Sequence, residues 1–419
     1  MTTSSPDSRQ WRSALTFLVG LGLMFLILAL PTPETIQTPA GPLDLTPAGK
    51  ATLGVLAFAV LLWATEALPF PVTGLLACVL LVMTKVAGLK TVVEWGFGNW
   101  IIMFFLGVLI FSAAIAETPL LRRVTTLVLY HLGHRPQAII LAFLVVGALL
   151  SGWITDMAVA AMLMPIAVSI LEDADAKPLE SNFGRALMIS CAWGPLIGGV
   201  STPAGCGPNP LTIGFLKDLA GIDFTFRQWM AIGFPATLLM LPFGWLILVK
   251  VFPPEPVQLG MAKEDFRKRL EELGPLTARE IWTLIIFVLM VTLWVFPGPI
   301  MRLSGGRIDY LGIQFVAIAC AVLFFLPGIN VISWETAEKR VSWGGIILIV
   351  AGLALGRSVA ETGAARWLAY VSFHKLGLLH PVVIVFAVVF GVSIMKVAFA
   401  STTVTGTIIV PLLIGLAQT

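Results

Sequence analysis

The stretch "SGWITDMAVAAMLMP", Ser151 to Pro165, places one carboxylate inside a run of otherwise small or apolar residues. A similar phrase returns as "ASTTVTGTIIVP", Ala400 to Pro411. In both phrases a short polar turn opens an apolar segment, and Thr155 and Ser401 each stand ten residues before a proline. These paired polar turns decide which fold the rest of the chain can adopt.

The composition is that of an integral membrane protein. Hydrophobic residues make up 58% of the chain and charged residues only 12%, and the mean hydropathy is +0.95. Such a chain would be insoluble as a water-facing globule. Ala14 to Leu30 and Met230 to Val249 are long enough to cross a bilayer as helices, as is Leu53 to Val82, which is interrupted at "TEALPFP".

Two apolar runs, Ala138 to Leu150 and Ala158 to Leu171, are too short to cross a bilayer. They flank the first polar turn. In lipid, a non-helical turn survives only where protein or a water-filled cavity surrounds it, because every backbone N–H and C=O needs a partner. The pattern therefore predicts a re-entrant hairpin over about 138–171.

Other classes of chemistry have weak support. The four cysteines lack zinc-ligand spacing, and no third ligand accompanies His131 and His134, so we expect no metal centre. No cluster of Lys and Arg indicates nucleic acid. An intramembrane hydrolase would need a second Asp facing Asp156, and no long apolar span supplies one. We therefore expect a protein that is not an enzyme; a channel is a further, less favoured, alternative.

The positions of the basic residues predict the orientation. Residues 1–13 are expected to be cytoplasmic, and 14–50 to form the first transmembrane helix and an extracytoplasmic loop without Lys or Arg before Lys50. This topology and the positive-inside bias put the other basic segments on the cytoplasmic side. They hold Arg9 and Arg12, Arg122, Arg123 and Arg135, Lys177 and Arg185, Lys250 to Arg279, and Lys339 and Arg340.

The chain contains an internal repeat. "FFLGVLIFSAAIAETPLLRR" (Phe104 to Arg123) matches "IVAGLALGRSVAETGAARW" (Ile349 to Trp367) in its small and apolar pattern and in its Glu-Thr pair. We predict a first copy over 51–250, a cytoplasmic linker over 251–280, with an amphipathic helix from Met261 to Glu280, and a second copy over 281–419. An odd number of crossings in each copy would make the two copies inverted in the membrane.

The second copy is the shorter one. After the first polar turn the chain continues through a broken helix over about 186–220 and another span, whereas after the second hairpin, over about 381–419, it stops. The comparison predicts that the second copy is truncated and lacks part of its own cation site.

The broken helix is the third interruption. "GGVSTPAGCGPNPLTIG", Gly198 to Gly214, is nearly half proline and glycine within an apolar span, which no uninterrupted helix would favour. Hydroxyls, carbonyls and helix ends at such a break suit Na⁺, and half-helix N-termini suit an anion.

These motifs resemble those of the divalent anion:sodium symporter family, the dicarboxylate, citrate and sulfate carriers of the solute carrier thirteen group. The resemblance rests on four motifs in the family's order. They are "WATEALPFPVTG", "LSGWITDMAVAAMLMP", "GGVSTPAGCGPNP" and "FASTTVTGTIIVP". It implies an all-α polytopic fold with two opposed re-entrant hairpins, a scaffold domain and a transport domain, a homodimer in the bilayer, and an elevator-type movement.

The resemblance also implies two overlapping sets of site residues. The expected substrate-binding residues are Thr155, Asp156, Met157, Ser401, Thr402, Thr403, Pro208 and Asn209. The expected cation-binding residues are Ser151, Thr155, Asp156, Gly199, Thr202 and Ser401. The family's turns normally read Ser-Asn-Thr, so this chain replaces the amide by a carboxyl group at Asp156 and by a hydroxyl at Thr402.

Asp156 has three readings: a ligand of Na⁺, a proton carrier that is neutral when a dianion is bound, or a carboxylate that is merely paired with a neighbouring base. We favour the first two, because charges inside a membrane are costly. Lys396, five residues before Ser401, is a second unexpected charge. Either its ammonium takes the place of one cation, or the side chain extends to the membrane interface.

The sequence therefore predicts a secondary active transporter of di- or tricarboxylates or related divalent anions in the inner (cytoplasmic) membrane. Na⁺ is the expected coupling ion, and H⁺ is the alternative. A sodium-independent anion exchanger, with Lys396 standing in for a cation, is the alternative function.

Overall fold

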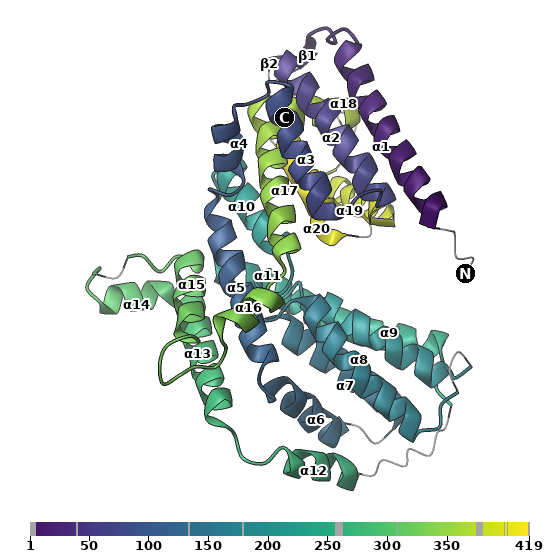
Figure 1. Ribbon diagram of the computed structural model, residues 1–419, viewed down its shortest axis with the longest axis vertical. Coiled ribbons are helices and arrows are strands. Elements are labelled where there is room, and N and C mark those ends of the chain that lie inside the picture. The colour runs from purple at the N-terminus through teal and green to yellow at the C-terminus, as the bar shows by residue number, and fades with distance from the viewer. Residues whose placement is uncertain are drawn as a thin grey trace. The chain divides into compact units, whose positions relative to one another are not determined.

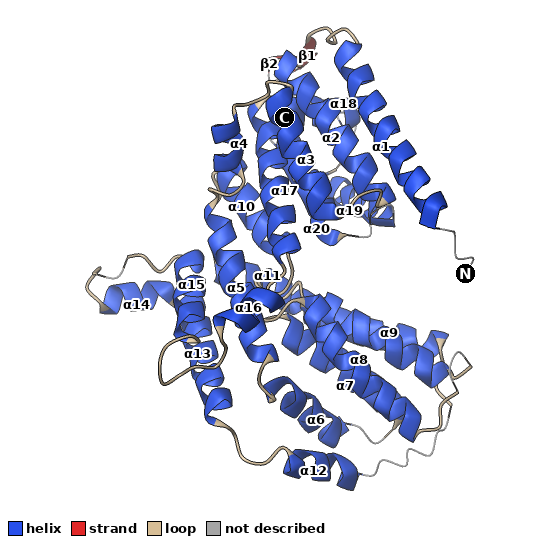
Figure 2. Cartoon of the chain, viewed as in Figure 1, coloured by secondary structure: helices blue, strands red, loops and turns tan. Residues whose placement is uncertain are grey.

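The protein is almost entirely helical (Figure 2). The structure is a computed structural model that describes residues 6–38, 41–132, 135–177, 180–255, 263–307, 309–373, 380–397, 399 and 401–417. The chain divides into two compact units. The first comprises Met1–Ile102, Leu211–Asp223 and Ser342–Thr419, and the second comprises Met103–Pro210 and Phe224–Val341.

The first unit is built from both ends of the chain (Figure 1). Its elements are α1 (Pro6–Ala29), β1 (Ile36–Thr38), β2 (Gly41–Leu43), α2 (Pro47–Thr65), α3 (Phe70–Met83), α4 (Leu89–Trp95), α17 (Trp343–Glu361), α18 (Ala364–Phe373), α19 (Pro381–Val397) and α20 (Thr402–Ala417). β1 and β2 form an antiparallel hairpin that the sequence pattern did not indicate.

The second unit is formed by the middle of the chain. Its elements are α6 (Leu120–Leu132), α7 (Pro136–Ser151), α8 (Asp156–Asp173), α9 (Asn182–Gly198), α11 (Phe226–Val251), α12 (Lys263–Glu272), α13 (Ala278–Val295), α14 (Pro297–Leu303), α15 (Ile313–Leu323) and α16 (Trp334–Arg340). Two helices cross the boundary between the units: α5 (Trp100–Ala116) begins in the first, and α10 (Pro208–Ala220) ends there.

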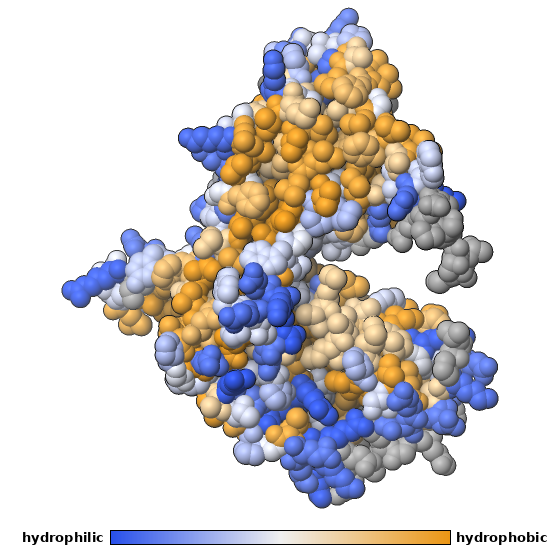
Figure 3. Space-filling model, viewed as in Figure 1, coloured by the Kyte–Doolittle hydropathy of each residue, from blue (hydrophilic) through white to orange (hydrophobic). Residues whose placement is uncertain are grey.

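Five described helices are long and apolar enough to cross a membrane: Gln10–Ala29, Pro47–Thr65, Phe226–Val251, Ala278–Val295 and Trp343–Glu361. A bent pair, Leu89–Trp95 with Trp100–Ala116, would make a sixth span. The prediction of a polytopic helical membrane protein is confirmed. Exposed apolar side chains such as Leu15, Leu18 and Phe25 would face lipid, and hydrophobic residues cover much of the first unit's visible surface (Figure 3).

The interruption predicted at "TEALPFP" separates α2 from α3. Glu66 ends α2 in a left-handed conformation, with φ of 51°, and Pro69 precedes the first turn of α3. The indole N–H of Trp63 donates to the carbonyl of Phe70 at 3.1 Å, so it satisfies a carbonyl at the start of α3. Trp63 is completely buried, which anchors this bend in the core of the first unit.

The two predicted copies share one order of helices. In each, a long helix ends beside a Glu-Thr pair, a short amphipathic helix follows, and two arms flank a polar turn. These helices are α5, α6, α7 and α8 in one copy and α17, α18, α19 and α20 in the other. The common order agrees with a duplication; inversion and the copy boundaries stay predictions.

The predicted linker helix is shorter than expected. We expected it to extend from Met261 to Glu280, but α12 ends at Glu272, and Met261 itself lies outside the described residues. Gly274 adopts a positive φ of 62°, and Thr277 and Glu280 form a capping box that starts α13. Glu280 therefore belongs to a buried helix start and not to a solvated linker.

Candidate functional site

Small residues let α7 and α9 pack closely in the second unit. The spacing of Gly194 and Gly198 on α9 is the GxxxG pattern that brings helix backbones together in membranes. A Cβ on Gly194 would lie 2.8 Å from the carbonyl oxygen of Leu144, and one on Gly147 would lie 2.6 Å from Cδ of Pro195. Since α7 ends at Ser151 and α9 ends at Gly198, this packing brings the first polar turn beside the break that follows α9.

Thr202 and Asn209 hold that junction together. The Thr202 hydroxyl donates to the carbonyl of Gly152 and accepts from the Ala204 N–H at 3.0 Å. The Asn209 amide donates to the carbonyls of Gly199 and Thr202, both at 2.7 Å. Its oxygen accepts from the Cys206 thiol at 3.1 Å. Asn209 is 5% exposed, so its amide braces the break and does not face an open cavity.

One buried hydroxyl at the junction has no partner. Ser151 is completely buried, and among the described residues its Oγ makes no hydrogen bond. A Cβ on Gly199 would lie 3.4 Å from this Oγ, and one on Gly205 would lie 2.6 Å from the Ser151 carbonyl oxygen. The Ser151 hydroxyl thus lies beside Gly199, and two carbonyl oxygens lie so close to Gly205 that only glycine fits there. Hard cations prefer such an oxygen set.

The acidic residue of the first turn begins a helix. Thr155 is the N-cap of α8, and Asp156 Oδ1 accepts from the Met157 N–H at 2.9 Å. A carboxylate in the first turn interacts favourably with the helix dipole. No ion pair joins Asp156 to another described residue, and Met157 is 80% exposed. Pro208, another of the expected substrate-binding residues, begins α10.

An aromatic cluster that the sequence analysis missed fixes the first turn. Trp153 stacks on Phe226 with 6.3 Å between ring centroids, and it meets Phe287 edge-on at 5.1 Å. Phe226 in turn stacks on Trp294 at 4.5 Å. No periodicity links these rings, because they come from α11, α13 and the turn itself. The aromatic cluster restrains the first turn against α11 and α13, two long apolar helices of the second unit.

The second turn lies in the first unit and is described there by itself. Ser401 caps α20, with its Oγ 3.4 Å from the Val404 N–H, and Thr402 and Thr403 form the first residues of that helix. Lys396, near the end of α19, donates through its ammonium to the carbonyl of Phe399 at 3.0 Å. Lys396 therefore contacts the backbone of the turn and does not extend away from it.

The start of α9 is held by a carboxylate from beyond α11. Glu255 accepts from the Asn182 N–H at 2.7 Å, the Phe183 N–H at 3.0 Å and the Ser181 hydroxyl at 3.2 Å. Desolvation raises the pKa of Glu255, but these hydrogen bonds outweigh it and lower the pKa to about 2. The carboxylate is ionised at neutral pH and stabilises the N-terminus of the helix that leads to the break.

Metal ligands do not gather elsewhere in the described part of the chain, where no three His, Cys, Asp or Glu residues lie close together. His131 Nδ1 is 2.9 Å from the carbonyl of Leu127, and His134 lies outside the described residues.

Membrane-spanning helices, two helical hairpins and an oxygen-lined helix break define a membrane transporter. Comparison with known proteins identifies the family of transporters. Residues 11–419 match the family described as the sodium:sulfate symporter transmembrane region, and the chain belongs to this family. The prediction of this family from the motifs is confirmed, as is the expectation that the protein is a transporter and not an enzyme.

Individual relatives agree with this placement. The sodium-dependent dicarboxylate transporter SdcS of Staphylococcus saprophyticus is 30% identical over 90% of this chain and 74% of its own length. The protein of the same name from Staphylococcus aureus is 29% identical over the same shares. A membrane protein of Cupriavidus necator is 26% identical over 94% of this chain and 77% of its own length.

Proposed function

We propose that this protein is a secondary active transporter that moves a small di- or tricarboxylate, or a related divalent anion, together with Na⁺. The observation that carries the proposal is the junction between the first turn and the break. There the unpartnered hydroxyl of Ser151 lies beside Gly199, and the oxygens of Gly199, Thr202 and Gly152 take part in the hydrogen bonds of the same junction. The names of the SdcS relatives support sodium as the coupling ion and dicarboxylate as the substrate class.

Each residue at the junction has a role in the proposed mechanism. Na⁺ accepts oxygen ligands from Ser151, Gly199 and Thr202, while Asn209 keeps the two carbonyls of the break oriented. Thr155 and Asp156 lie at the start of α8, where the positive end of the helix dipole attracts an anion and the Asp156 carboxylate attracts a cation. Binding both ions together lowers the cost of placing either charge within the membrane. H⁺ carried by Asp156 is the alternative coupling ion.

A change at Ser151 tests the cation site. Ser151→Ala removes a hydroxyl that has no described hydrogen bond, so the melting temperature should stay within about 2 °C of the unaltered protein. Loss of one oxygen ligand should raise the sodium concentration for half-maximal uptake about tenfold. Uptake of radiolabelled succinate, citrate and sulfate into proteoliposomes, over a series of sodium gradients, measures the shift.

Ser190→Ala is the matched control. Ser190 is also buried, but its hydroxyl donates to the carbonyl of Leu187 at 2.6 Å. This variant should lose some thermal stability and keep its sodium dependence. An unchanged sodium dependence in Ser151→Ala, or equal shifts in both variants, would contradict the proposed site.

The proposal includes an orientation and a movement. Contacts within the second unit join segments that the charge bias assigns to the cytoplasm: Arg123 with Gly274, Arg269 with Asp173, and Arg340 with Glu117. They support a common side for these segments in the cytoplasmic membrane, with a cytoplasmic N-terminus. The inverted repeat, the homodimer and an elevator-type movement belong to the same proposal.

A sodium-independent anion exchanger is the second candidate function, and the hydrogen bond from Lys396 to Phe399 favours it. In this candidate function the Lys396 ammonium, bonded to a backbone carbonyl of the second turn, stands in for a coupling cation. In this case uptake against a preloaded anion continues in sodium-free buffer, and Lys396→Ala abolishes it or makes it sodium-dependent. Uptake that needs sodium in the unaltered protein and is unchanged in Lys396→Ala would exclude the exchanger.

A further inference from the structure

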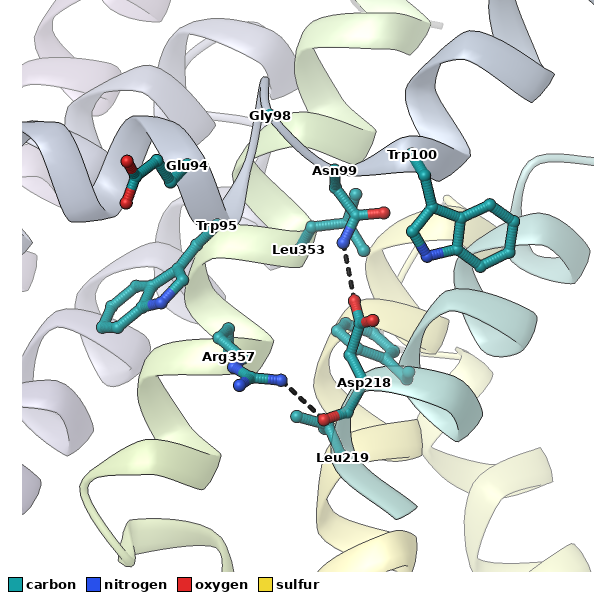
Figure 4. A pocket seen from close by; sticks show the side chains of 10 residues that line it. Glu94, Trp95, Gly98, Asn99, Trp100, Asp218, Leu219, Leu353 and Arg357 are labelled. Atoms are coloured by element: carbon teal, nitrogen blue, oxygen red, sulfur yellow. Dashed lines mark hydrogen bonds between the residues drawn. The ribbon is translucent and has the colours of Figure 1, made fainter. Parts of the chain in front are cut away.

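A cavity of about 330 Å³ in the first unit lies among the ends of several helices. It is lined where α4 ends, where α5 begins, at the end of α10 and along α17 (Figure 4). Polar side chains that line it include Asn99, Asp218 and Arg357, with Glu94 at the end of α4. Asn99, Asp218 and Arg357 belong neither to the first turn nor to the break after α9. The candidate cation site therefore does not explain this polar cluster.

Asn99 joins two helix ends. Its amide nitrogen donates to Asp218 Oδ2 at 2.6 Å, and its amide oxygen accepts from the Ile101 N–H at 3.0 Å. The first bond holds the last turn of α10, and the second caps the first turn of α5. A hydrogen bond to a carboxylate is stronger than one between neutral groups. The orientation of the Asn99 amide is therefore fixed by both partners.

Arg357 holds the same residue from α17. Its guanidinium donates to the backbone carbonyl of Asp218 at 2.5 Å and pairs with Glu361 at 2.6 Å. Asn99 and Arg357 approach Asp218 from different sides in Figure 4. Lys217, the preceding residue, places its ammonium 5.3 Å from the ring centroid of Trp100. The end of α10 thus has a specific polar attachment to two other helices.

The other end of α10 lies at the break. Asn209 is the second residue of the helix, and Asp218 is nine residues further along. At about 1.5 Å per residue, the two are about 14 Å apart along one continuous helix. A helix of this length transmits a rotation or tilt at one end directly to the other. Hence the attachment at Asp218 restrains the direction in which Asn209 presents its amide to the carbonyls of Gly199 and Thr202.

We propose that Asn99 and Asp218 form a positioning pair for cation binding: their hydrogen bond fixes the orientation of α10 and thereby the oxygens that Asn209 braces at the break. This inference rests on the proposed sodium-coupled transport. Neither residue touches the transported ions. Both act through α10, and Arg357 supports the pair by binding the Asp218 carbonyl.

Exchange of the two side chains tests the pair. Asn99→Asp places two carboxylates against each other and should raise the sodium concentration for half-maximal uptake about tenfold, with the maximal rate within about twofold of normal. Asp218→Asn leaves a weaker, neutral amide pair and should have a smaller effect. The double variant, Asn99→Asp with Asp218→Asn, restores an amide–carboxylate bond and should return the value to within about twofold of normal.

Asp223→Asn is the control, because Asp223 lies just beyond α10 and pairs with the half-exposed Lys217 at 2.9 Å, away from Asn99 and Arg357 in the sequence. It should behave as the unaltered protein, and the melting temperature of every variant shows whether it is folded. Normal sodium dependence in Asn99→Asp would overturn the pair, as would a folded double variant as impaired as that single variant. Absence of sodium-driven uptake by the unaltered protein would instead overturn the proposed function.

Discussion

Gly198→Ala is expected to abolish transport and to destabilise the protein by about 3 kcal/mol or more. A Cβ at this position would lie 2.5 Å from the carbonyl carbon of Ala148 and closer still to its Cα and oxygen. These are backbone atoms of α7, so no side-chain rotation relieves the clash, and α7 and α9 must move apart. Because both helices end at the candidate site, the separation displaces Ser151 from Gly199. Uptake in proteoliposomes and the melting temperature in detergent measure the two effects.

Other glycines provide a graded control. A Cβ on Gly194 would lie 2.8 Å from the Leu144 carbonyl oxygen, so Gly194→Ala should have a smaller effect in the same direction. A Cβ on Gly391 of α19 would meet no described atom within 4 Å, and Gly391→Ala should be neutral or slightly stabilising, since alanine favours helix. If Gly198→Ala transports normally, the close packing of α7 on α9 is not what positions the site.

The apolar patterns predicted the helices well, because helices in a membrane need long apolar runs that can be recognised in the sequence. The predicted arms Ala138–Leu150 and Ala158–Leu171 correspond to α7 and α8, and the interruption at "TEALPFP" separates α2 from α3. Each boundary carries a local signal, either proline or a polar residue within an apolar run. The family followed from motifs of the same kind.

The roles of single residues were harder to predict. Asn209 was expected to bind substrate, a role that stays a prediction, and its amide bonds to the carbonyls of Gly199 and Thr202. The partner of an amide is set by the path of the chain, which the residue type does not reveal. The aromatic cluster around Trp153 and the pair Asn99–Asp218 likewise join residues far apart in the sequence. The capping box from Thr277 to Glu280, by contrast, has a signal within the local sequence, the Thr-x-x-Glu pattern.

The contact between Arg123 and Glu280 is another long-range pair, and it carries the second large prediction. Arg123 binds Glu280 through Nε at 2.6 Å and donates to the carbonyls of Leu273, Gly274 and Pro275 at 2.8–2.9 Å. The Arg123 side chain is 16% exposed and that of Glu280 is 0% exposed. The guanidinium is thus enclosed by the chain that enters α13, and it attaches α6 to this chain.

Arg123→Ala is expected to destabilise the protein by about 3–5 kcal/mol, because it leaves the Glu280 carboxylate buried without a counter-charge and three carbonyls without their donor. Arg123→Lys should have a stability between that of the unaltered protein and that of Arg123→Ala, since an ammonium keeps the charge but cannot reproduce the planar set of donors. Arg122→Ala is the matched control: Arg122 is the exposed neighbour, and its loss should cost less than about 0.5 kcal/mol. Thermal unfolding in one detergent compares the three variants.

A double variant distinguishes the loss of the Arg123 hydrogen bonds from the cost of burying an unpaired Glu280 carboxylate. Arg123→Met combined with Glu280→Met removes both charges and keeps similar apolar volume, so it should be more stable than Arg123→Ala alone. Equal stability of the two would mean that the bonds to Leu273, Gly274 and Pro275 provide most of the stabilisation. A small effect of Arg123→Ala itself would contradict the attachment of α6 to the start of α13. Because α6 directly precedes the first hairpin arm, transport should fall together with stability in this series and recover together in the double variant.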